Sequence, residues 1–391
     1  MPGTDLVTGA TGFSGAYVVR DLLAAGRRVI ATDLQRVLDD AAHREVLSAV
    51  GLDLKHPKLQ LVPSDLLDPA SLTMLFEAPV DRVFHTASLY DYSATLDLLR
   101  RVNVDGTKNL LAAIDGAGGV KRFVHWSTCG VFGKPYTAAD RPNTNLPFAE
   151  DSPSPRNSPD GASGPADTEL VNEYSITKWE QEQLVWRWSR NGGSPVTVVR
   201  PAPMYGPGSS YGHGGIILAI AQGLVPFVPR DAKNYITSSV HVEDMARFAC
   251  HVAGRKESAG EDYNVVDNSI ISYFEFLKYI GLLTGRKLPE VWGINLKLAM
   301  PVLEAAAKSW TFLERRFGVP RPRILEVQSA SYMSSSYWLD NRKSLATGFE
   351  YKYSDVREGL KDTIAWFRRM GWLMDRGRLL TSQGVGPKLL D

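Results

Sequence analysis

Two side chains that could act together in proton transfer are Tyr174 and Lys178, which stand four residues apart in the stretch NEYSITKWEQEQ (172–183). The stretch is expected to be helical, so the two side chains would lie one turn apart on the same face. A tyrosine with its ordinary pKa of about 10 is a poor base at neutral pH. An ammonium one turn away stabilises the phenolate, and the pair could then take a proton from an alcohol. The same spacing also arises by chance on solvated helix surfaces, so other residues must decide.

A glycine-rich stretch near the start of the chain suggests a dinucleotide site. VTGATGFSG (7–15) places Gly9, Gly12 and Gly15 between an apolar run and an amphipathic segment. Such glycines permit a tight turn, leave the backbone bare against a pyrophosphate and open the next helix N-terminus to it. The spacing is one residue longer between the first two glycines than in the common fingerprint. A structural turn uses glycine too, but the position after the opening strand favours a cofactor site.

Two carboxylates follow the next apolar runs. Asp33 lies 18 residues after Gly15, where a carboxylate accepts hydrogen bonds from both ribose hydroxyls and repels a 2′-phosphate. This favours NAD over NADP, although Arg36 could soften the repulsion. Asp65 ends a third run, where the adenine would lie, and its alternative role is to cap the next helix.

These motifs occur in a fixed order with several others. Asp65-Leu66, HTAS (85–88), VNVDGTKNLL (102–111) and STCGVFG (127–133) follow the glycines and Asp33. Tyr174-xxx-Lys178, RPAPMYGPG (200–208) and VHVEDMA (240–246) come next. Together they resemble the extended short-chain dehydrogenase/reductase superfamily over roughly residues 4–285.

The resemblance implies roles for particular residues. It makes Tyr174 and Lys178 catalytic, and it puts Thr128, with Ser127 beside it, where a hydroxyl holds the substrate oxygen. It assigns Asn103 to a turn beneath the active site, where an amide could equally satisfy backbone groups. It also implies a homodimer through long helices near 91–114 and 168–190. The residues expected at the cofactor are Gly9, Gly12, Phe13, Ser14, Gly15, Asp33, Asp65, Leu66, Thr86, Ala87, Ser88, Asn103, Tyr174, Lys178 and Pro201.

Within the superfamily, two observations point to an apolar substrate. Related dehydratases carry an acidic residue directly after the catalytic threonine, whereas this chain has Cys129, which disfavours dehydration. Epimerases and dehydratases need cations for a nucleotide diphosphate, yet residues 201–229 contain no Asp, Glu, Lys or Arg. The C-terminal third resembles the 3β-hydroxysteroid dehydrogenase group and its sterol-4-carboxylate relatives in its general character more than in any motif.

The expected activity is therefore NAD-dependent oxidation of a sterol or steroid 3β-hydroxyl, with or without loss of a 4-carboxylate. A sugar-nucleotide 4-epimerase is the alternative enzyme. A non-catalytic dinucleotide-sensing module is the alternative from another class, and the intact set of Tyr174, Lys178 and Thr128 argues against it.

The elements that must position these residues alternate regularly in the first half of the chain. Apolar runs alternate with helical patterns up to about residue 200, which predicts a doubly wound parallel α/β sheet, the Rossmann fold. We expect residues 1–200 to form the NAD-binding domain and 201–391 a smaller, mostly helical substrate lobe interleaved with the last strands. Residues 141–167, rich in Pro, Ser, Asn, Asp and Gly, predict an irregular, mobile loop. Later helices are expected near 214–223, 243–254, 273–284, 294–317 and 354–370.

Composition narrows the choice of partners and location. The net charge is +1, which gives no global attraction to nucleic acid. The two cysteines form no CxxC pair, His213 and His241 have no metal-ligand companions, and no room is left for a signal peptide before the first strand. We expect a cytoplasmic protein without a metal. The segment 294–317, apolar apart from a narrow charged stripe, predicts peripheral membrane contact or a helix packed in the second lobe.

Overall fold

A computed structural model describes residues 3–91, 94–133, 137–138, 141–152, 170, 172–293, 305, 309, 316 and 336–373. In this part of the chain, none of the helices has the length and apolar character that spanning a bilayer requires.

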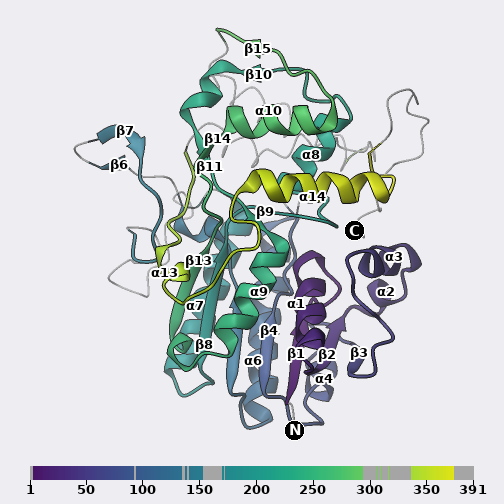
Figure 1. The fold of residues 1–391 in the computed structure, drawn as a ribbon. Helices are drawn as coiled ribbons and strands as arrows, with labels where there is room; N and C mark the ends of the chain where they lie inside the picture. The colour runs from purple at the N-terminus through teal and green to yellow at the C-terminus, as the bar shows by residue number, and fades with distance from the viewer. Residues whose placement is uncertain are drawn as a thin grey trace.

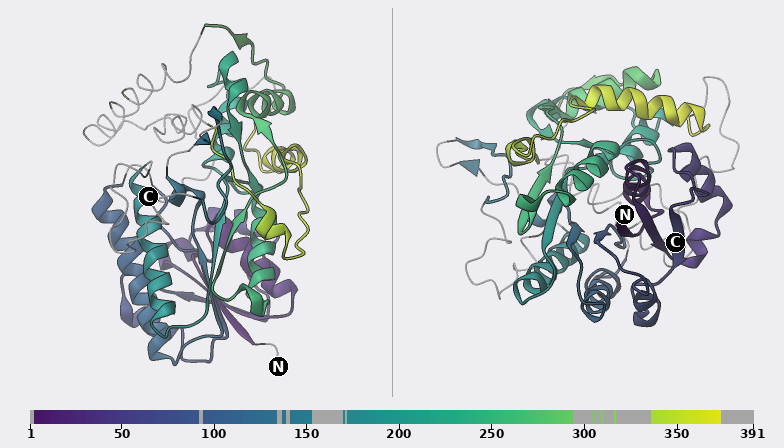
Figure 2. Two further views of the ribbon diagram at one scale, coloured as in Figure 1. Left: turned by 90° about the vertical axis from the view of Figure 1, so that its left-hand side faces the viewer. Right: turned by 60° about the horizontal axis from the view of Figure 1, so that its bottom comes forward.

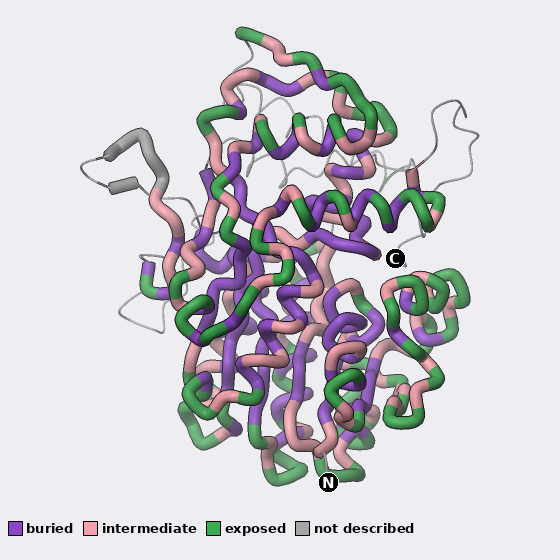
Figure 3. The backbone as a smooth tube through the Cα atoms, in the orientation of Figure 1, coloured by how far each residue is buried: buried purple, intermediate pink, exposed green. Residues whose placement is uncertain are grey.

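A parallel sheet of seven strands forms the centre of the molecule, in the order β13-β8-β5-β4-β1-β2-β3 (Figure 1). All neighbouring pairs are parallel. Interior strands such as β5 are buried along their whole length, because helices cover both faces (Figure 3). The strands are β1 (Thr4–Thr8), β2 (Arg28–Asp33), β3 (Leu59–Pro63), β4 (Arg82–His85), β5 (Arg122–Trp126), β8 (Val196–Pro201) and β13 (Glu261–Val265).

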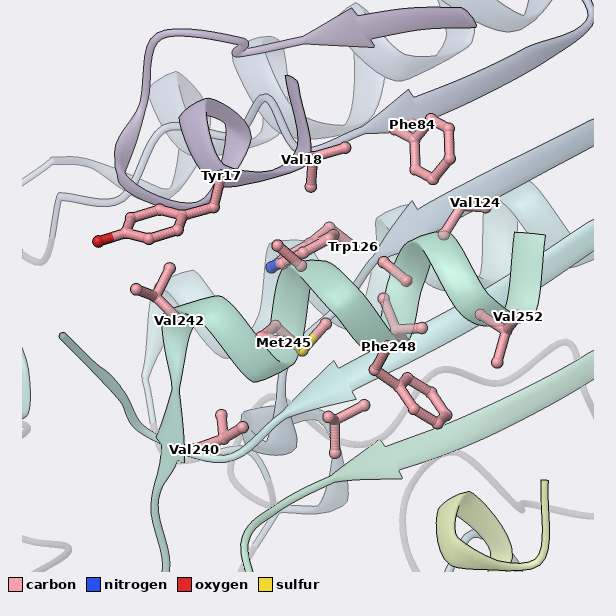
Figure 4. Close-up of a cluster of buried hydrophobic side chains, with 14 of the residues drawn as sticks. Tyr17, Val18, Phe84, Val124, Trp126, Val240, Val242, Met245, Phe248 and Val252 are labelled. Carbon is pink, nitrogen blue, oxygen red and sulfur yellow. The ribbon is translucent and has the colours of Figure 1, made fainter. Parts of the chain in front are cut away.

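Helices cover the sheet in two layers, which Figure 2 shows edge-on. On one face α1 packs against α9, and their apolar side chains, including Tyr17, Met245 and Phe248, meet Phe84 and Val124 of the sheet (Figure 4). The opposite face carries α4, α6 and α7. The helices of these layers are α1 (Phe13–Ala24), α4 (Pro69–Met74), α5 (Leu96–Leu99), the π-helical turn η1 (Arg100–Asp105), α6 (Gly106–Gly116), α7 (Glu173–Arg190) and α9 (Val242–Ala253). Between β2 and β3 lie α2 (Gln35–Leu38) and α3 (Ala41–Ala49).

A smaller lobe sits over one end of the sheet (Figure 1). Its core joins apolar side chains of three helices, among them Ile217, Phe276, Ile280, Leu360 and Phe367. The helices are α8 (His213–Ala221), α10 (Tyr273–Thr284) and α14 (Val356–Arg369), with the short α13 (Arg342–Leu345) lying beside β13. The short strands are β9 (Met204–Tyr205), β10 (Val228–Pro229), β11 (Ile236–Thr237), β12 (Val240–His241), β14 (Ile271–Ser272) and β15 (Glu290–Val291), and the single turns are η2 (Cys129–Phe132), η4 (Arg230–Asn234) and η5 (Lys256–Ser258).

The chain crosses between the two parts more than once. After β8 it enters the lobe, returns to the sheet as α9 and β13, and leaves again for α10. The sheet therefore depends on residues up to Val265.

Two predicted elements differ from the structure, and a third lies mostly outside the described residues. Residues 141–145, expected in an irregular loop, form β7 (Arg141–Asn145), which pairs with β6 (Thr137–Ala138); residues 153–167 of that loop lie outside the described residues. The helix expected near 168–190 begins only at Glu173, as α7. The Asn172 side chain accepts a hydrogen bond from the Ser175 N–H and caps the helix there. Of the helix predicted at 294–317, only residues 305, 309 and 316 are described.

Candidate active site

The predicted site residues gather at the carboxyl ends of the parallel strands. The order of the strands reverses between β1 and β4, and ligands of open α/β sheets bind in the crevice at such a point. A pocket opens here between the sheet and the smaller lobe. It is lined by Ser14, Thr86, Ser88, Tyr90, Trp126, Ser127, Thr128, Cys129, Gly130, Tyr174, Ser175, Lys178, Pro201, Ala202, Pro203, Met204, Tyr211, Gly212, His213, Ile216, Tyr273 and Tyr337.

The glycine loop between β1 and α1 is built without room for side chains. Gly9 has a φ of +62°, and a Cβ there would lie 2.8 Å from the Cα of Ala87. A Cβ on Gly15 would lie 2.1 Å from the carbonyl oxygen of Gly9. The N-cap of α1 is Gly12, which provides no side-chain cap, and the first turn contains no acidic residue. The backbone N–H groups at this helix end are thus suited to an anion.

The carboxylate of Asp33 lies beside this loop. Its Oδ2 accepts hydrogen bonds from the Thr11 N–H at 3.2 Å and the Thr11 hydroxyl at 2.8 Å, while Oδ1 accepts one from Leu34 N–H. Asp33 therefore joins the end of β2 to the turn that precedes α1.

Asp65 and Leu66 follow β3 outside the pocket. Asp65 is exposed and its Oδ1 accepts a hydrogen bond from Leu67 N–H at 2.8 Å. The alternative role as a helix cap is wrong, since Asp68 caps α4. Leu66 packs against Gly106 at the start of α6.

Residues 86–88 connect the glycine loop to the lysine. The Thr86 hydroxyl donates to the carbonyl of Thr8 at 2.7 Å, and Ala87 lies directly against Gly9. The Ser88 hydroxyl accepts a hydrogen bond from Lys178 Nζ at 2.9 Å. Thr86 and Ser88 also line the pocket.

Tyr174 and Lys178 lie on α7 and both face the pocket, as their spacing predicts. Lys178 is 2% exposed, and its ammonium donates to Ser88 Oγ, the carbonyl of Trp126 at 2.7 Å and Gln181 Oε1 at 2.5 Å. Burial lowers the pKa of Lys178 to about 7. The lysine is thus fixed in place and close to the point of losing its proton at neutral pH.

A buried polar network extends from this lysine to β1. Gln181 Nε2 donates to the hydroxyl of Thr107, which itself donates to the carbonyl of Asn103. The ring of His85 lies between Thr107 Oγ1 and Thr8 Oγ1, at 2.9 and 2.7 Å. Burial, with a smaller effect of Lys178, lowers the pKa of His85 to about 3, so this histidine is neutral and structural.

Thr128 and Ser127 follow β5 and have different surroundings. Thr128 caps η2, where its hydroxyl oxygen accepts from Gly130 N–H at 3.2 Å, and it lines the pocket. The Ser127 hydroxyl instead donates to the buried carboxylate of Glu182 at 2.5 Å. The Ser127 proton is thereby directed away from the pocket, which leaves Thr128 as the group suited to a substrate oxygen.

Asn103 is fully buried in η1 and does not line the pocket. Its Oδ1 accepts from Leu89 N–H at 2.7 Å, and its Nδ2 donates to the Leu89 carbonyl and to Thr177 Oγ1. Asn103 therefore fixes the segment after β4 against α7, which matches a support beneath the site and not a direct cofactor contact.

Several residues that line or support the pocket were not predicted from the sequence. Tyr90 packs edge-on against Tyr174, with ring centroids 4.9 Å apart, and lies 4.8 Å from the ring of Tyr211. His213, Tyr273 and Tyr337 come from the smaller lobe and its last segment. No motif marks these positions. Glu182 could have been found, because it follows Lys178 by one helical turn.

The residues present fit an NAD molecule. The uncapped, acid-free N-terminus of α1 suits the pyrophosphate, and the Asp33 carboxylate beside the loop suits a ribose with free hydroxyls. Lys178 and Tyr174 line the pocket beyond the switch point, where Lys178 contacts Ser88 after β4 and Trp126 at the end of β5, and the nicotinamide half would reach them there. Among the described residues, no cluster of His, Cys, Asp and Glu could hold a metal ion.

Comparisons with known proteins agree with this geometry. The NAD dependent epimerase/dehydratase family matches residues 6–266. The 3 beta-hydroxysteroid dehydrogenase/Delta 5-->4-isomerase of Mycobacterium tuberculosis is 27% identical over 355 residues, which span 88% of this chain and 84% of that protein. Sterol demethylase protein B of Methylococcus capsulatus is 29% identical over 386 residues, or 95% of this chain and 100% of that protein.

A solved structure shows the same fold. UDP-glucose 4-epimerase of Thermus thermophilus in complex with NAD superposes with a TM-score of 0.63, covering 93% of this chain and 99% of that one. At 21% identity this likeness concerns the fold and not the substrate.

Proposed function

Because the chain belongs to the NAD dependent epimerase/dehydratase family, we propose that it oxidises the 3β-hydroxyl of a sterol or steroid-like substrate to a ketone. It is an NAD-dependent enzyme of the extended short-chain dehydrogenase/reductase type. The substrate is the proposed part, and the character of the pocket supports it.

The observation that carries the proposal is the lack of charge in the pocket. Among the described lining residues, Lys178 is the only one with a formal charge, and the proposed mechanism assigns its ammonium to the phenolate and the nicotinamide ribose. A sugar nucleotide brings a diphosphate, which binds through cations and helix N-termini. The rest of the lining consists of neutral side chains, among them Met204, Ile216 and Tyr273. Such a lining suits a flat apolar substrate.

The chain's own groups would carry out proton transfer. Tyr174 would remove the hydroxyl proton, Lys178 would stabilise the phenolate and hold the nicotinamide ribose, and Thr128 would hold the substrate oxygen. Bound NAD would accept the hydride. Burial raises the pKa of the Cys129 thiol to about 12, so the residue after Thr128 is a weak acid and a poor proton donor for dehydration. A substrate with a 4-carboxylate would become a β-keto acid and lose carbon dioxide readily.

A substrate panel tests the proposal. Purified protein would be incubated with NAD and either 3β-hydroxysteroids, sterols with and without a 4-carboxylate, or UDP-sugars, and NADH formation followed at its absorbance band. We expect steroid-dependent NADH, reduced about a hundredfold or more in Tyr174→Phe at unchanged NAD affinity. Interconversion of UDP-glucose and UDP-galactose without steroid turnover would instead make the protein a 4-epimerase.

The coenzyme preference rests on Asp33. A carboxylate at the ribose repels a 2′-phosphate, so NAD should be preferred to NADP. Arg36 follows on α2, but the hydrogen bonds that Asp33 accepts from Thr11 keep the carboxylate at the cofactor loop.

We also propose peripheral membrane contact on the lobe side. Trp292 is 70% exposed and carries the guanidinium of Arg230 over its ring at 3.2 Å, directly before the segment 294–317. Leu282 is 73% exposed on α10. Aromatic and cationic groups together suit an anionic lipid interface, where apolar substrates reside.

A homodimer through the helices on one face of the sheet remains a proposal as well. The helices on that face, η1 and α7 among them, pack side by side and would together form the face that meets the second copy.

A further inference from the structure

Helix α7 holds the end of β5 with two side chains that lie one turn apart. Lys178 Nζ donates to the carbonyl of Trp126 at 2.7 Å, and Glu182 Oε2 accepts from the Ser127 hydroxyl at 2.5 Å. Trp126 is the last residue of β5, and Ser127 directly precedes Thr128. The backbone from which Thr128 enters the pocket is therefore fixed at two successive residues from the same helix.

The carboxylate of Glu182 is fully buried and bonded to a fully buried guanidinium. Arg200 Nε donates to Glu182 Oε2 at 3.0 Å and its Nη2 donates to Oε1 at 2.6 Å. The same guanidinium donates to Asp262 Oδ2 at 2.7 Å. Burial opposes the charge on Arg200, but Glu182 and Asp262 outweigh it and raise the arginine pKa. The set joins α7, β8 and β13 behind the catalytic residues.

Stability alone does not account for such a set. Desolvation of a buried ion pair offsets most of its Coulomb attraction, and apolar residues of similar volume often stabilise a fold at least as well. An ion pair retained at this place, with a third contact to Ser127, is better explained by what it positions.

We propose that Glu182 is a positioning residue of the active site, which holds the end of β5 through Ser127 and places a negative charge beside Lys178. This inference rests on the proposed roles of Thr128 and Lys178. Arg200, in turn, holds Glu182 in its place.

The charge of Glu182 matters because few other charges face Lys178. Burial lowers the pKa of this lysine, and Glu182 acts in the opposite direction. The side chains of His85 on β4 and His125 on β5 also face it, but burial lowers the pKa of both, so they stay neutral. Arg200 on β8 is positive throughout, and Tyr174 shares the helix. Loss of the Glu182 charge should therefore move Lys178 deprotonation to lower pH.

The test compares Glu182→Gln with Glu180→Gln, a control on the same helix. Glu180 pairs with Arg100 and does not line the pocket. NADH affinity would be measured by fluorescence between pH 5.5 and 9, since the Lys178 ammonium is expected to bind the nicotinamide ribose. We expect the pH at which affinity falls to shift to lower values in Glu182→Gln and to stay unchanged in Glu180→Gln.

Turnover supplies the second readout. At the pH optimum, kcat of Glu182→Gln should fall about ten- to a hundredfold, as for a misplaced catalytic group, while NADH affinity changes less than about threefold. If Glu182→Gln does not fold, the double variant Glu182→Gln/Arg200→Met, which also removes the guanidinium that has lost the Glu182 charge, is measured instead. The inference would be overturned if Glu182→Gln left kcat and the pH dependence of NADH affinity unchanged. It would also be overturned if kcat and NADH affinity fell equally and the pH dependence of the affinity did not shift.

This test is separate from that of the substrate. The binding measurement needs no turnover, and kcat can be measured with whichever steroid or nucleotide sugar the wild type accepts. A failure of steroid oxidation would therefore leave the Glu182 result intact.

Discussion

Asp33 contacts the cofactor loop from the end of β2, with both hydrogen bonds from Thr11 made to the same carboxylate oxygen. Asp33→Asn keeps a hydrogen-bond acceptor and removes the charge, whereas Asp33→Ala removes both. We expect both variants to narrow the preference for NAD over NADP, and only Asp33→Ala to lower kcat/KM for both coenzymes as the loop loosens. Steady-state kinetics with each coenzyme measures this. A wild type that prefers NADP would contradict the assignment.

Lys178 should make the stability of the cofactor-free protein depend on pH. Its pKa is lowered by burial from an ordinary 10.5 to about 7, so between these values the unfolded chain binds more protons than the folded one. The free energy of unfolding should therefore rise with pH from about 7 to 10, by at most roughly 5 kcal/mol for a shift of this size.

Urea unfolding at pH 7 and pH 9 measures the effect, with Lys178→Met as the comparison. The variant lacks the titrating group, so its stability should change less between the two pH values than that of the wild type. An equal change in the free energy of unfolding between pH 7 and pH 9 in both proteins would show that Lys178 keeps its proton in the folded state.

The residues proposed to react stand in motifs of the sequence, whereas most of those that hold them do not. Tyr174, Lys178 and Thr128 stand in ordered motifs, and each of them lines the pocket. Ser127 has the right type and place, but its hydroxyl contacts Glu182, which only the packing of α7 on β5 reveals. Tyr90, by contrast, depends on a loop whose course no motif describes.

At the scale of elements, the glycine loop and α1 form one unit whose geometry leaves no space for a methyl group. Gly15→Ala would bring a Cβ within 2.1 Å of the Gly9 carbonyl oxygen, so α1 must shift. The backbone N–H groups at its N-terminus would then no longer point at the pyrophosphate. We expect a large loss of NADH affinity, at least tenfold. Gly116→Ala in α6 is the control, since a Cβ there meets nothing within 4 Å.

The control should behave in the opposite way. Alanine in place of an unstrained glycine reduces the entropy of the unfolded chain and stabilises by about 0.4–1 kcal/mol. Isothermal titration with NADH and thermal unfolding together separate the two effects. Normal NADH affinity in Gly15→Ala would contradict the proposed cofactor loop.

Strands and helices of the sheet were predictable from their apolar runs, but a change of helix type within an element was not. The pattern near 91–114 predicts one long helix, and the structure has a continuous helix in which the π-helical turn η1 joins α5 to α6. The turn carries Asn103, whose amide binds Leu89 and Thr177. These partners belong to other segments, so the local sequence contains no sign of the extra residue in the turn.

At the scale of the whole molecule, the proposed membrane contact predicts binding to anionic vesicles. The segment 294–317 carries Trp310 and Phe312, and the exposed Trp292 precedes it. In liposome flotation at low salt, wild type should float with phosphatidylserine vesicles, and less so when salt screens the charges. Trp310→Ser/Phe312→Ser should reduce flotation. Wild type that stays at the bottom of the gradient at low salt would exclude the contact.

The late strand β13 has a consequence for how the chain folds as it is synthesised. β8 is complete at Pro201, but its neighbour β13 ends only at Val265, and α9, which covers α1, lies between them. At roughly 5–20 residues per second, translation takes several seconds to supply these residues. During that interval β8 is an open sheet edge, and Arg200 lacks its Asp262 partner. A nascent chain paused there would be prone to aggregate and in need of a chaperone, and a fragment cut at residue 200 would remain in that state permanently.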